Sequence, residues 1–391
     1  MTLLTCRLML APAAIAALLS LGGAGARAAN PLKIGVIAQF SGNFADFGEQ
    51  IGNGIDLYVR QHGDVAGRKV EILRRDTAGP NADKAKQLAQ ELIVRDKVEF
   101  IAGIDFTPTA FAIAPLITEA KMPTVIMNAA TLIIPDRSPY FVRFASALDT
   151  LQEKLAEWAL KNGIKQSYVM VSDYVAGHAA GDAFKKTFTA GGGEIVGETG
   201  VPLEGLDIAA YVQRIADLKP QAVFVFLSST KQSMQFTKLF VQTGLKAAGT
   251  KILGGTDLFD ASGSKNESDD ALGAYSVQNY SWTLDNPLNH AYVKDYAAAF
   301  GPSPHPDFMS VQAYDGMAGI YRVTEKLKGV ITGDAAMAAF KGLAFESPRG
   351  PIKIGDSRDV TQPIYIRQVV RGEKGELINK EIFTFPEVPN R

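Results

Sequence analysis

The chain has 391 residues, with 40 basic and 41 acidic side chains and a formal net charge of −1. This even balance, without a basic stripe, gives no indication of a nucleic-acid partner. The length exceeds that of a typical single core, so we expect two domains.

The first 28 residues have the features of a secretory signal peptide. Arg7 supplies a basic start, residues 8–21 are apolar, and an A-x-A cleavage sequence ends at Ala28. The apolar stretch is shorter than the roughly 20 residues of a bilayer span, which favours cleavage over an uncleaved anchor. Cys6 is the only cysteine, so the exported chain would have no disulfide, thiol nucleophile or thiolate metal site.

Residues 32–61 read as a strand, a turn and a helix. The apolar run from Ile34 to Phe40 lacks strict alternation, which is typical of a parallel strand buried on both faces. Such a unit places a ligand position at the carboxyl end of its strand. Ser41 and Phe47 in the turn are therefore candidate ligand contacts. Phe44 and Phe47 could equally plug the loop, because phenylalanine is usually buried.

The pattern of a strand followed by a helix repeats along the chain and predicts parallel sheets of an α/β fold. The series is interrupted after about residue 148 and starts again, so we expect two doubly wound lobes. The expected strands are Val70–Leu73, Phe100–Gly103, Thr124–Met127, Tyr168–Ser172, Glu194–Val201, Ala222–Leu227 and Lys251–Gly254, and the expected helices are Asn81–Asp96, Leu148–Asn162, Gly177–Ala190, Ile208–Leu218 and Lys231–Gly244.

Polar residues follow two strands of the first series. Thr107 before Pro108 is a helix-start signal, with threonine as N-cap and proline at the first helical position. The free N–H groups and the positive end of the helix dipole there suit a carboxylate, although Thr107 could simply cap its helix. Asn128, Ala129 and Thr131 follow the next strand and offer an amide, a close backbone approach and a hydroxyl.

The second series also ends its strands in polar residues. Tyr174, Ser229, Thr256 and Asp257 lie at these ends and are candidate ligand contacts. Each has a structural alternative, since such residues also cap helices, hold turns or shield an edge.

Motifs of common enzyme classes are missing from the sequence. It contains no nucleophile elbow, P-loop, dinucleotide fingerprint or H-E-x-x-H sequence. Its histidines are isolated from one another, which argues against a histidine-rich metal site. We therefore expect neither catalysis, nor a cofactor, nor a metal, although carboxylates alone could still bind one.

Several stretches together resemble one protein family. The segments IGVIAQFSGNFADFGEQIGNGIDL, GIDFTPTAFAIAP, MNAAT, VSDYVAGH, FMSVQAYDGM and ESPRGPIKI are similar in order and spacing to the periplasmic solute-binding proteins of branched-chain amino-acid type ABC importers. The resemblance runs from about Leu32 to Phe385. It implies the type I periplasmic binding fold, with two lobes joined by three crossovers that close over a ligand.

The resemblance also implies an organisation and partners. The signal peptide would be residues 1–28, the first lobe residues 29–148 plus 281–349, and the second lobe residues 149–280 plus 350–391. The family implies a monomer in the periplasm that delivers a small carboxylate ligand to a membrane permease. A sensor that presents its closed state to a receptor is the alternative function.

The family's ligand contacts can be placed on matching positions. Phe47 matches the aromatic residue that packs on the ligand, and Thr107 matches the hydroxyl residue that holds the ligand carboxylate. Ala129 and Thr131 match positions that complete the carboxylate site. Tyr174 and the region of Ser229 fall where the family has second-lobe contacts, although VSDYVAGH is one residue short of the usual spacing before Tyr174.

The sequence departs from the amino-acid binders at the position of the ligand ammonium's partner. An ungapped alignment puts Thr256 at the position of the family's carboxylate, with Asp257 next to it. A ligand ammonium buried without a partner would be costly, so a missing carboxylate points to a ligand without an amine. MNAAT and SPRGPI also resemble the branch associated with aromatic acids. Aromatic acids and hydrophobic amino acids both stay open as ligands, because Asp257 could supply the charge.

Overall fold

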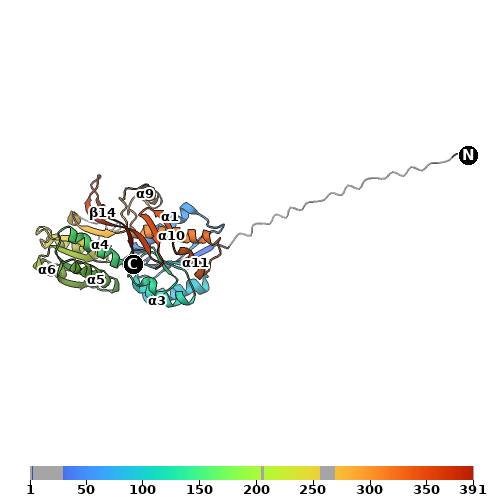
Figure 1. Cartoon of the computed structure of the whole chain (residues 1–391), viewed down its shortest axis with the longest axis horizontal. Coiled ribbons are helices and arrows are strands. Elements are labelled where there is room, and N and C mark those ends of the chain that lie inside the picture. The colour runs from blue at the N-terminus through green and yellow to red at the C-terminus, as the bar shows by residue number, and fades with distance from the viewer. Residues whose placement is uncertain (1, 3–29, 204–206, 256–268, 391) are drawn as a thin grey trace.

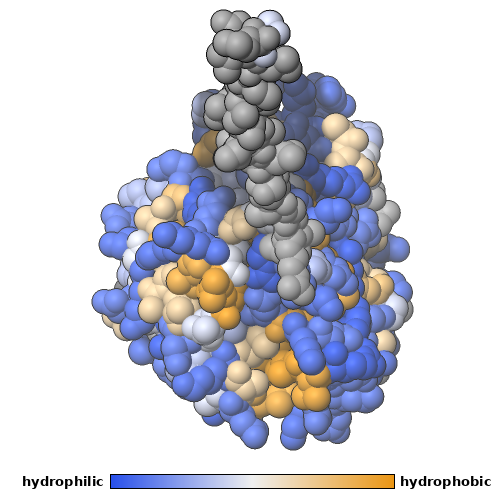
Figure 2. All heavy atoms as spheres, turned by 90° about the vertical axis from the view of Figure 1, so that its right-hand side faces the viewer, coloured by the Kyte–Doolittle hydropathy of each residue, from blue (hydrophilic) through white to orange (hydrophobic). Residues whose placement is uncertain are grey.

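The computed structural model describes Thr2 and residues 30–203, 207–255 and 269–390, so most of the predicted signal peptide lies outside it. Its two α/β lobes confirm the predicted fold class. Figure 1 shows α4, α5 and α6 on one side of the molecule and α1, α3, α10 and α11 on the other. Figure 2 shows one end of the molecule, where hydrophilic side chains dominate and apolar ones form small separate patches.

The first lobe is built on a parallel sheet of five strands in the order β2-β1-β3-β4-β5. The strand order reverses beside β1, which places a ligand crevice at the carboxyl ends of the strands. The strands are β1 (Leu32–Ala38), β2 (Val70–Asp76), β3 (Phe100–Gly103), β4 (Thr124–Ile126) and β5 (Phe141–Arg143).

Helix α1 of this half is amphipathic, whereas α10 is buried on nearly all of its faces. In α1, Ile51, Ile55 and Tyr58 are buried at the spacing of one helical face, and α1 packs on α10. The helical segments are η1 (Gly42–Phe44), α1 (Ala45–His62), α2 (Ala82–Gln90), η2 (Glu91–Arg95), α3 (Thr107–Glu119), η3 (Ile134–Arg137), α9 (Pro287–Phe300), α10 (Phe308–Lys326) and α11 (Gly333–Phe340).

The second lobe contains a nine-stranded sheet in the order β11-β12-β13-β10-β9-β8-β6-β7, with β14 beside β13. Strands β6 to β10 are parallel, whereas β11 to β14 join through antiparallel pairs. The strands are β6 (Gln166–Ser172), β7 (Glu194–Val201), β8 (Ala222–Phe226), β9 (Lys251–Gly254), β10 (Tyr275–Gln278), β11 (Ala344–Ser347), β12 (Gly350–Ile354), β13 (Val360–Arg371) and β14 (Leu377–Pro389), and the helical segments are α4 (Leu148–Lys161), α5 (Val175–Ala190), α6 (Ala209–Leu218), α7 (Thr230–Gln242) and η4 (Asp269–Ala271).

The lobe limits stay a prediction, because β11 and β12 belong to the second sheet by hydrogen bonding but pack on the first lobe. Ile352 and Ile354 of β12 are buried in the same apolar cluster as β1, and Phe345 of β11 packs against that cluster. Two further clusters fill the two faces of the second lobe's parallel strands. The C-terminal strands therefore connect the two lobes.

Two buried ion pairs lie where the chain crosses between the lobes. Arg143 at the end of β5 donates through Nε to Asp359 Oδ1 at 2.6 Å and through Nη2 to Asp359 Oδ2 at 2.8 Å, and both side chains are almost completely buried. Arg349 donates through Nε to Asp315 Oδ2 of α10 at 2.6 Å. Its Nη1 donates to Gln362 Oε1 of β13 at 2.5 Å.

A further donor of Arg349 reaches the segment that leads from the first lobe into the second. Its Nη2 donates to the carbonyl oxygen of Phe144 at 2.9 Å, and its side chain is fully buried. One guanidinium thus holds α10, β13 and the Phe144 segment together. A buried charge of this kind is stable only with its partners in place.

Removing the Arg349 guanidinium should therefore destabilise the protein strongly. We expect Arg349→Met to lower the free energy of unfolding in urea by about 3–5 kcal/mol, because Asp315 would stay buried without its counter-charge. Arg95→Met is the matched control, since Arg95 pairs with Glu91 and Asp96 on the surface with 61 % of its side chain exposed. It should leave stability nearly unchanged, because exposed ion pairs contribute little. Equal effects of the two substitutions would contradict this role.

Candidate functional site

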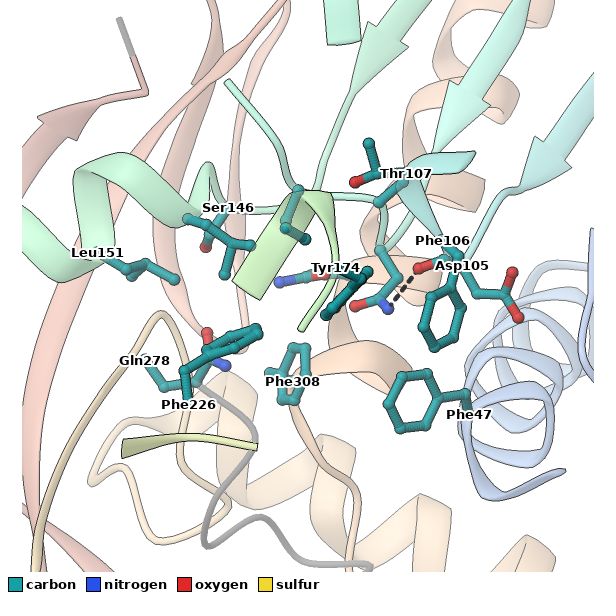
Figure 3. A pocket seen from close by; sticks show the side chains of 16 residues that line it. Phe47, Asp105, Phe106, Thr107, Ser146, Leu151, Tyr174, Phe226, Gln278 and Phe308 are labelled. Carbon is teal, nitrogen blue, oxygen red and sulfur yellow. Dashed lines mark hydrogen bonds between the residues drawn. The ribbon is translucent and has the colours of Figure 1, made fainter. Parts of the chain in front are cut away.

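A cavity of about 450 Å³, part of it open to solvent, lies between the lobes at the carboxyl ends of the strands. Its walls come from the first turn of α1, from the segments after β3 and β4, from the ends of β8 and β10, and from the starts of four further helices. Figure 3 shows Thr107, Phe106 and Phe47 on one side and Phe226, Gln278 and Leu151 on the other. Residues far apart in the sequence therefore form one site.

Aromatic rings from both lobes face the cavity. Phe47 and Phe106 of the first lobe stack with their centroids 5.5 Å apart, and the ring of Phe106 lies 6.3 Å from that of Tyr174 in the second lobe. Phe226 and Phe308 complete the wall (Figure 3). A flat apolar ligand would find ring faces and edges on several sides.

The two phenylalanines of the first turn have different positions. Phe44 is buried with its ring centroid 5.1 Å from Phe106 and 5.7 Å from Phe47, and it does not line the cavity. Phe47 lines the cavity from the first turn of α1. Phe44 thus packs against the Phe47 and Phe106 rings from outside the cavity wall.

Four helices begin at the cavity wall. The first residues of α3, α4 and α10 are Thr107, Leu148 and Phe308, and all three line the cavity together with Ala176, the second residue of α5. The backbone N–H groups of a first helical turn have no partner within their helix, and the helix dipole is positive there. At α10 the Asp307 carboxyl already accepts from the N–H groups of Met309 and Ser310, so the starts of α3, α4 and α5 are the better anion positions. No Lys, Arg or His occurs among the described residues that line the cavity. The backbone therefore provides the positive field for an anion.

Two glycines let helices start directly against strand ends. A Cβ at Gly48 would lie 2.2 Å from the Gln39 carbonyl oxygen, and a Cβ at Gly177 would lie 1.8 Å from that of Ser172. Both contacts are far inside the van der Waals distance, so only glycine permits these approaches. They bring Phe47 and the start of α5 to the cavity.

Thr107 has a different local role from the one that we expected. Helix α3 begins at Thr107, its N-cap is Phe106, and no side chain caps it. The Thr107 hydroxyl instead shares a hydrogen bond with the Thr131 hydroxyl at 2.8 Å, and Arg143 Nη1 donates to the Thr131 carbonyl oxygen at 2.8 Å. The simple cap interpretation was therefore wrong, because the Thr107 side chain turns toward Thr131.

Asn128 and Ala129 lie where β4 opens into the cavity, and both line it. Asn128 Nδ2 donates to the Asp105 carbonyl oxygen at 2.9 Å, a bond drawn in Figure 3. The Ala129 N–H donates to the Ile104 carbonyl oxygen at 2.9 Å. The Ala129 N–H is therefore already used and is not free to bind a ligand carboxylate.

The remaining predicted contacts lie at different places. Tyr174 lines the cavity, and its hydroxyl bonds the Ser228 hydroxyl at 3.0 Å, whereas Ser229 next to it is not in the wall. Ser41 also lies outside the wall, where its hydroxyl donates to Asp76 Oδ2 at 2.5 Å. Thr131 is behind Thr107 and is not in the wall. Thr256 and Asp257 fall outside the described residues.

Sequence reasoning missed several residues of the wall. Phe226 and Gln278 are the last residues of β8 and β10, and Phe106 follows the end of β3, directly before Thr107. Their positions at or after strand ends could have identified them from the sequence. Phe308 and Gln312 are one helical turn apart on α10, in the quoted FMSVQAYDGM segment. The missed members are Asp105, Phe106, Ala130, Ser146, Leu148, Leu151, Ala176, Phe226, Gln278, Phe308 and Gln312.

Asp105 is an acidic residue buried at the edge of the cavity. Its Oδ2 accepts from the Gln39 N–H at 2.7 Å, and its Oδ1 has no hydrogen-bond partner in the described part of the chain. In Figure 3 its carboxyl group lies toward helix α1. Burial, only partly offset by backbone N–H groups, raises the pKa of Asp105 to about 7.

The raised pKa of Asp105 has a consequence for stability. The folded protein keeps this proton up to about pH 7, whereas the unfolded chain releases it near pH 3.8, so the contribution of Asp105 is most favourable below about pH 4 and falls as the pH rises toward 7. The gap between the two pKa values corresponds to about 4 kcal/mol. We expect Asp105→Asn, which keeps an acceptor for Gln39, to abolish this loss in urea unfolding between pH 4 and 8. An unchanged pH profile in the variant would contradict this prediction.

The described residues contain neither a helix long and apolar enough to cross a bilayer nor a group of three or more side chains arranged to hold a metal ion.

Known proteins match almost the full chain. The Leu/Ile/Val-binding protein homolog 6 of Brucella suis biovar 1 is 39 % identical over 93 % of both chains. A solute-binding protein of an ABC transporter from Rhodopseudomonas palustris BisB5, solved with 3,4-dihydroxybenzoic acid, is 43 % identical with a TM-score of 0.87, over 92 % of this chain and 98 % of that one.

A second structure supports the same relationship. The solute-binding protein from Rhodopseudomonas palustris HaA2, solved with p-hydroxybenzoic acid, has a TM-score of 0.89 and 38 % identity over 93 % of this chain and 98 % of that one. Residues 31–375 match the periplasmic binding protein family. That family transports solutes and is not catalytic. The match over residues 31–375, together with the two α/β lobes, shows that this chain belongs to the periplasmic binding protein family.

Proposed function

We propose that this protein captures an aromatic carboxylate between its lobes as the solute-binding component of an ABC importer. One observation carries the proposal. The cavity is walled by aromatic rings of both lobes at the point where four helices begin, and none of its described lining residues is basic. This arrangement suits a small anion with a flat apolar body.

The two halves of such a ligand have different requirements. The ring of the ligand would pack among Phe47, Phe106 and Tyr174, whose area and edges suit an aromatic partner. Its carboxylate would accept hydrogen bonds from the first turn of α3 and from the Thr107 hydroxyl, with the helix dipole favouring the negative charge. Two similar solute-binding structures contain hydroxybenzoic acids, which supports this ligand class.

A hydrophobic amino acid is the second candidate, supported by the name of the Brucella suis relative. Its ammonium group would need an acidic partner in the cavity. Asp105 is the acidic residue among the described lining residues, but its carboxyl lies toward α1 and its pKa is raised to about 7. Binding of an amino acid would therefore depend on Asp257 as the partner of the ligand ammonium. If Thr256 occupies that partner position instead, an acid without an amine would be favoured.

Capture would follow from closure of the lobes. Phe106 and Tyr174 belong to different lobes, so a ligand between their rings gains contacts from both and shifts the population toward the closed form. The closed monomer would then dock on a membrane permease in the periplasm. A sensor that presents the closed form to a receptor is the alternative, and ligand uptake in a deletion strain would separate the two.

The first test is a ligand screen with the purified mature protein. We expect aromatic carboxylates such as benzoate and cinnamate to raise the melting temperature, because a ligand that binds only the native state stabilises it. Hydrophobic L-amino acids form the comparison panel. A shift with the amino acids alone would overturn the aromatic-acid proposal and point to Asp257 as the ammonium partner.

The carboxylate site can be tested at Thr107. We expect Thr107→Ala to weaken binding of an aromatic acid more than tenfold, because a hydrogen bond to a charged group contributes about 1.5–3 kcal/mol. Thr107→Ser should retain most of the affinity, since it keeps the hydroxyl.

Thr118→Ala is the matched control for this test. Thr118 is on the same helix α3, and its hydroxyl bonds the Ala114 carbonyl oxygen and Ser138, away from the cavity wall. It should leave affinity unchanged in calorimetry. Equal affinities for the Thr107→Ala and wild-type proteins would show that this hydroxyl does not hold the ligand.

A further inference from the structure

We infer that Gln312 selects aromatic acids that carry a ring hydroxyl over unsubstituted ones. This assignment rests on the proposed function and adds the chemistry that the cavity recognises on the ring. It depends on the buried amide oxygen of a wall residue, for which the described part of the chain provides no hydrogen-bond donor. Gln312 is on α10, whereas the proposed carboxylate site is at Thr107 on α3.

Gln312 lines the cavity one helical turn after Phe308, which lines it too. This spacing puts both side chains on the same face of α10. The Gln312 side chain is 1 % exposed, and its Oε1 has no hydrogen-bond partner within the described residues. Among the described residues, the Gln312 amide therefore has an acceptor without a donor, on the same face of α10 as Phe308.

Several other polar groups around the cavity already have partners, and the unpaired Oδ1 of Asp105 belongs to a carboxyl that lies toward α1. The Thr107 hydroxyl bonds Thr131, the Tyr174 hydroxyl bonds Ser228, and the Ser146 hydroxyl accepts from Gln362 Nε2 at 2.9 Å. A ring hydroxyl would have to compete with these bonds. At Gln312 it would instead fill an empty acceptor.

The energetic consequence is selectivity as well as affinity. A buried acceptor left unpaired keeps its full desolvation penalty, so a ligand that donates to it gains more than an ordinary exchange of hydrogen bonds. An unsubstituted ring would leave Oε1 of Gln312 unpaired in a closed cavity. A site with a group of this kind discriminates strongly against the analogue that lacks the hydroxyl.

The test compares benzoate, 3-hydroxybenzoate and 4-hydroxybenzoate by calorimetry on the mature protein and on Gln312→Met. The wild-type protein should bind at least one hydroxybenzoate tenfold or more tightly than benzoate. Gln312→Met, which keeps the side-chain length without a polar amide, should weaken that hydroxybenzoate at least tenfold. The affinity of the variant for benzoate should be at least one third of the wild-type affinity.

Gln152→Met is the matched control. Gln152 lies on α4 outside the cavity wall, fully buried, and neither its Oε1 nor its Nε2 has a hydrogen-bond partner in the described chain. It should leave the ratio of the two affinities as in the wild-type protein. If Gln312→Met and Gln152→Met change that ratio equally, the assignment is overturned.

The wild-type measurements separate the two proposals without any variant. If benzoate binds as tightly as both hydroxybenzoates, the assignment of Gln312 is overturned while the aromatic-acid function stands. If none of the three acids binds, the proposed function is overturned and the assignment with it. A hydroxybenzoate preference that Gln312→Met removes supports both.

Discussion

The two buried arginines at the crossovers are the constraint on which the geometry of this protein depends. Arg349 binds Asp315 of the first lobe and Gln362 of the second sheet, and Arg143 binds Asp359 just before β13. A buried ion pair is often no more stable than an apolar replacement, but it fixes one arrangement because any other leaves a charge unpaired. The crossovers are therefore held in one defined arrangement.

The same network reaches the cavity. Gln362, which accepts from Arg349, donates through Nε2 to the Ser146 hydroxyl and accepts from Asn279 Nδ2 at 2.9 Å. Ser146 lines the cavity, and the N–H of Asn279 donates to Gln278, another lining residue. The wall at this end is thus positioned by side chains whose geometry the arginine sets. A ligand against Ser146 and Gln278 would therefore contact groups that this network positions.

The sequence was sufficient for the fold because parallel strands buried on both faces leave uninterrupted apolar runs, such as AVFVF of β8. It missed β5 and β11, which are only three and four residues long, and the antiparallel pairing of β11–β14. Pro363 lies inside β13 at a shift in register with β14, where a proline is tolerated. Strand ends indicated Thr107 and Tyr174, whereas Gln312 depends on which face of α10 meets the cavity, and packing alone decides that.

Under the proposed function, the absence of a basic side chain among the described lining residues would explain how one cavity can bind an anion and then release it. A buried arginine or lysine would bind a carboxylate tightly but would stay uncompensated whenever the cavity is empty. Helix N-termini supply partial charges that belong to the backbone and cannot move or titrate, and water can solvate them while the lobes are open. In the proposed cycle, closure would exclude water and strengthen the hydrogen bonds to the anion, so affinity and closure would be linked in the same step, and opening would weaken the hold on the anion.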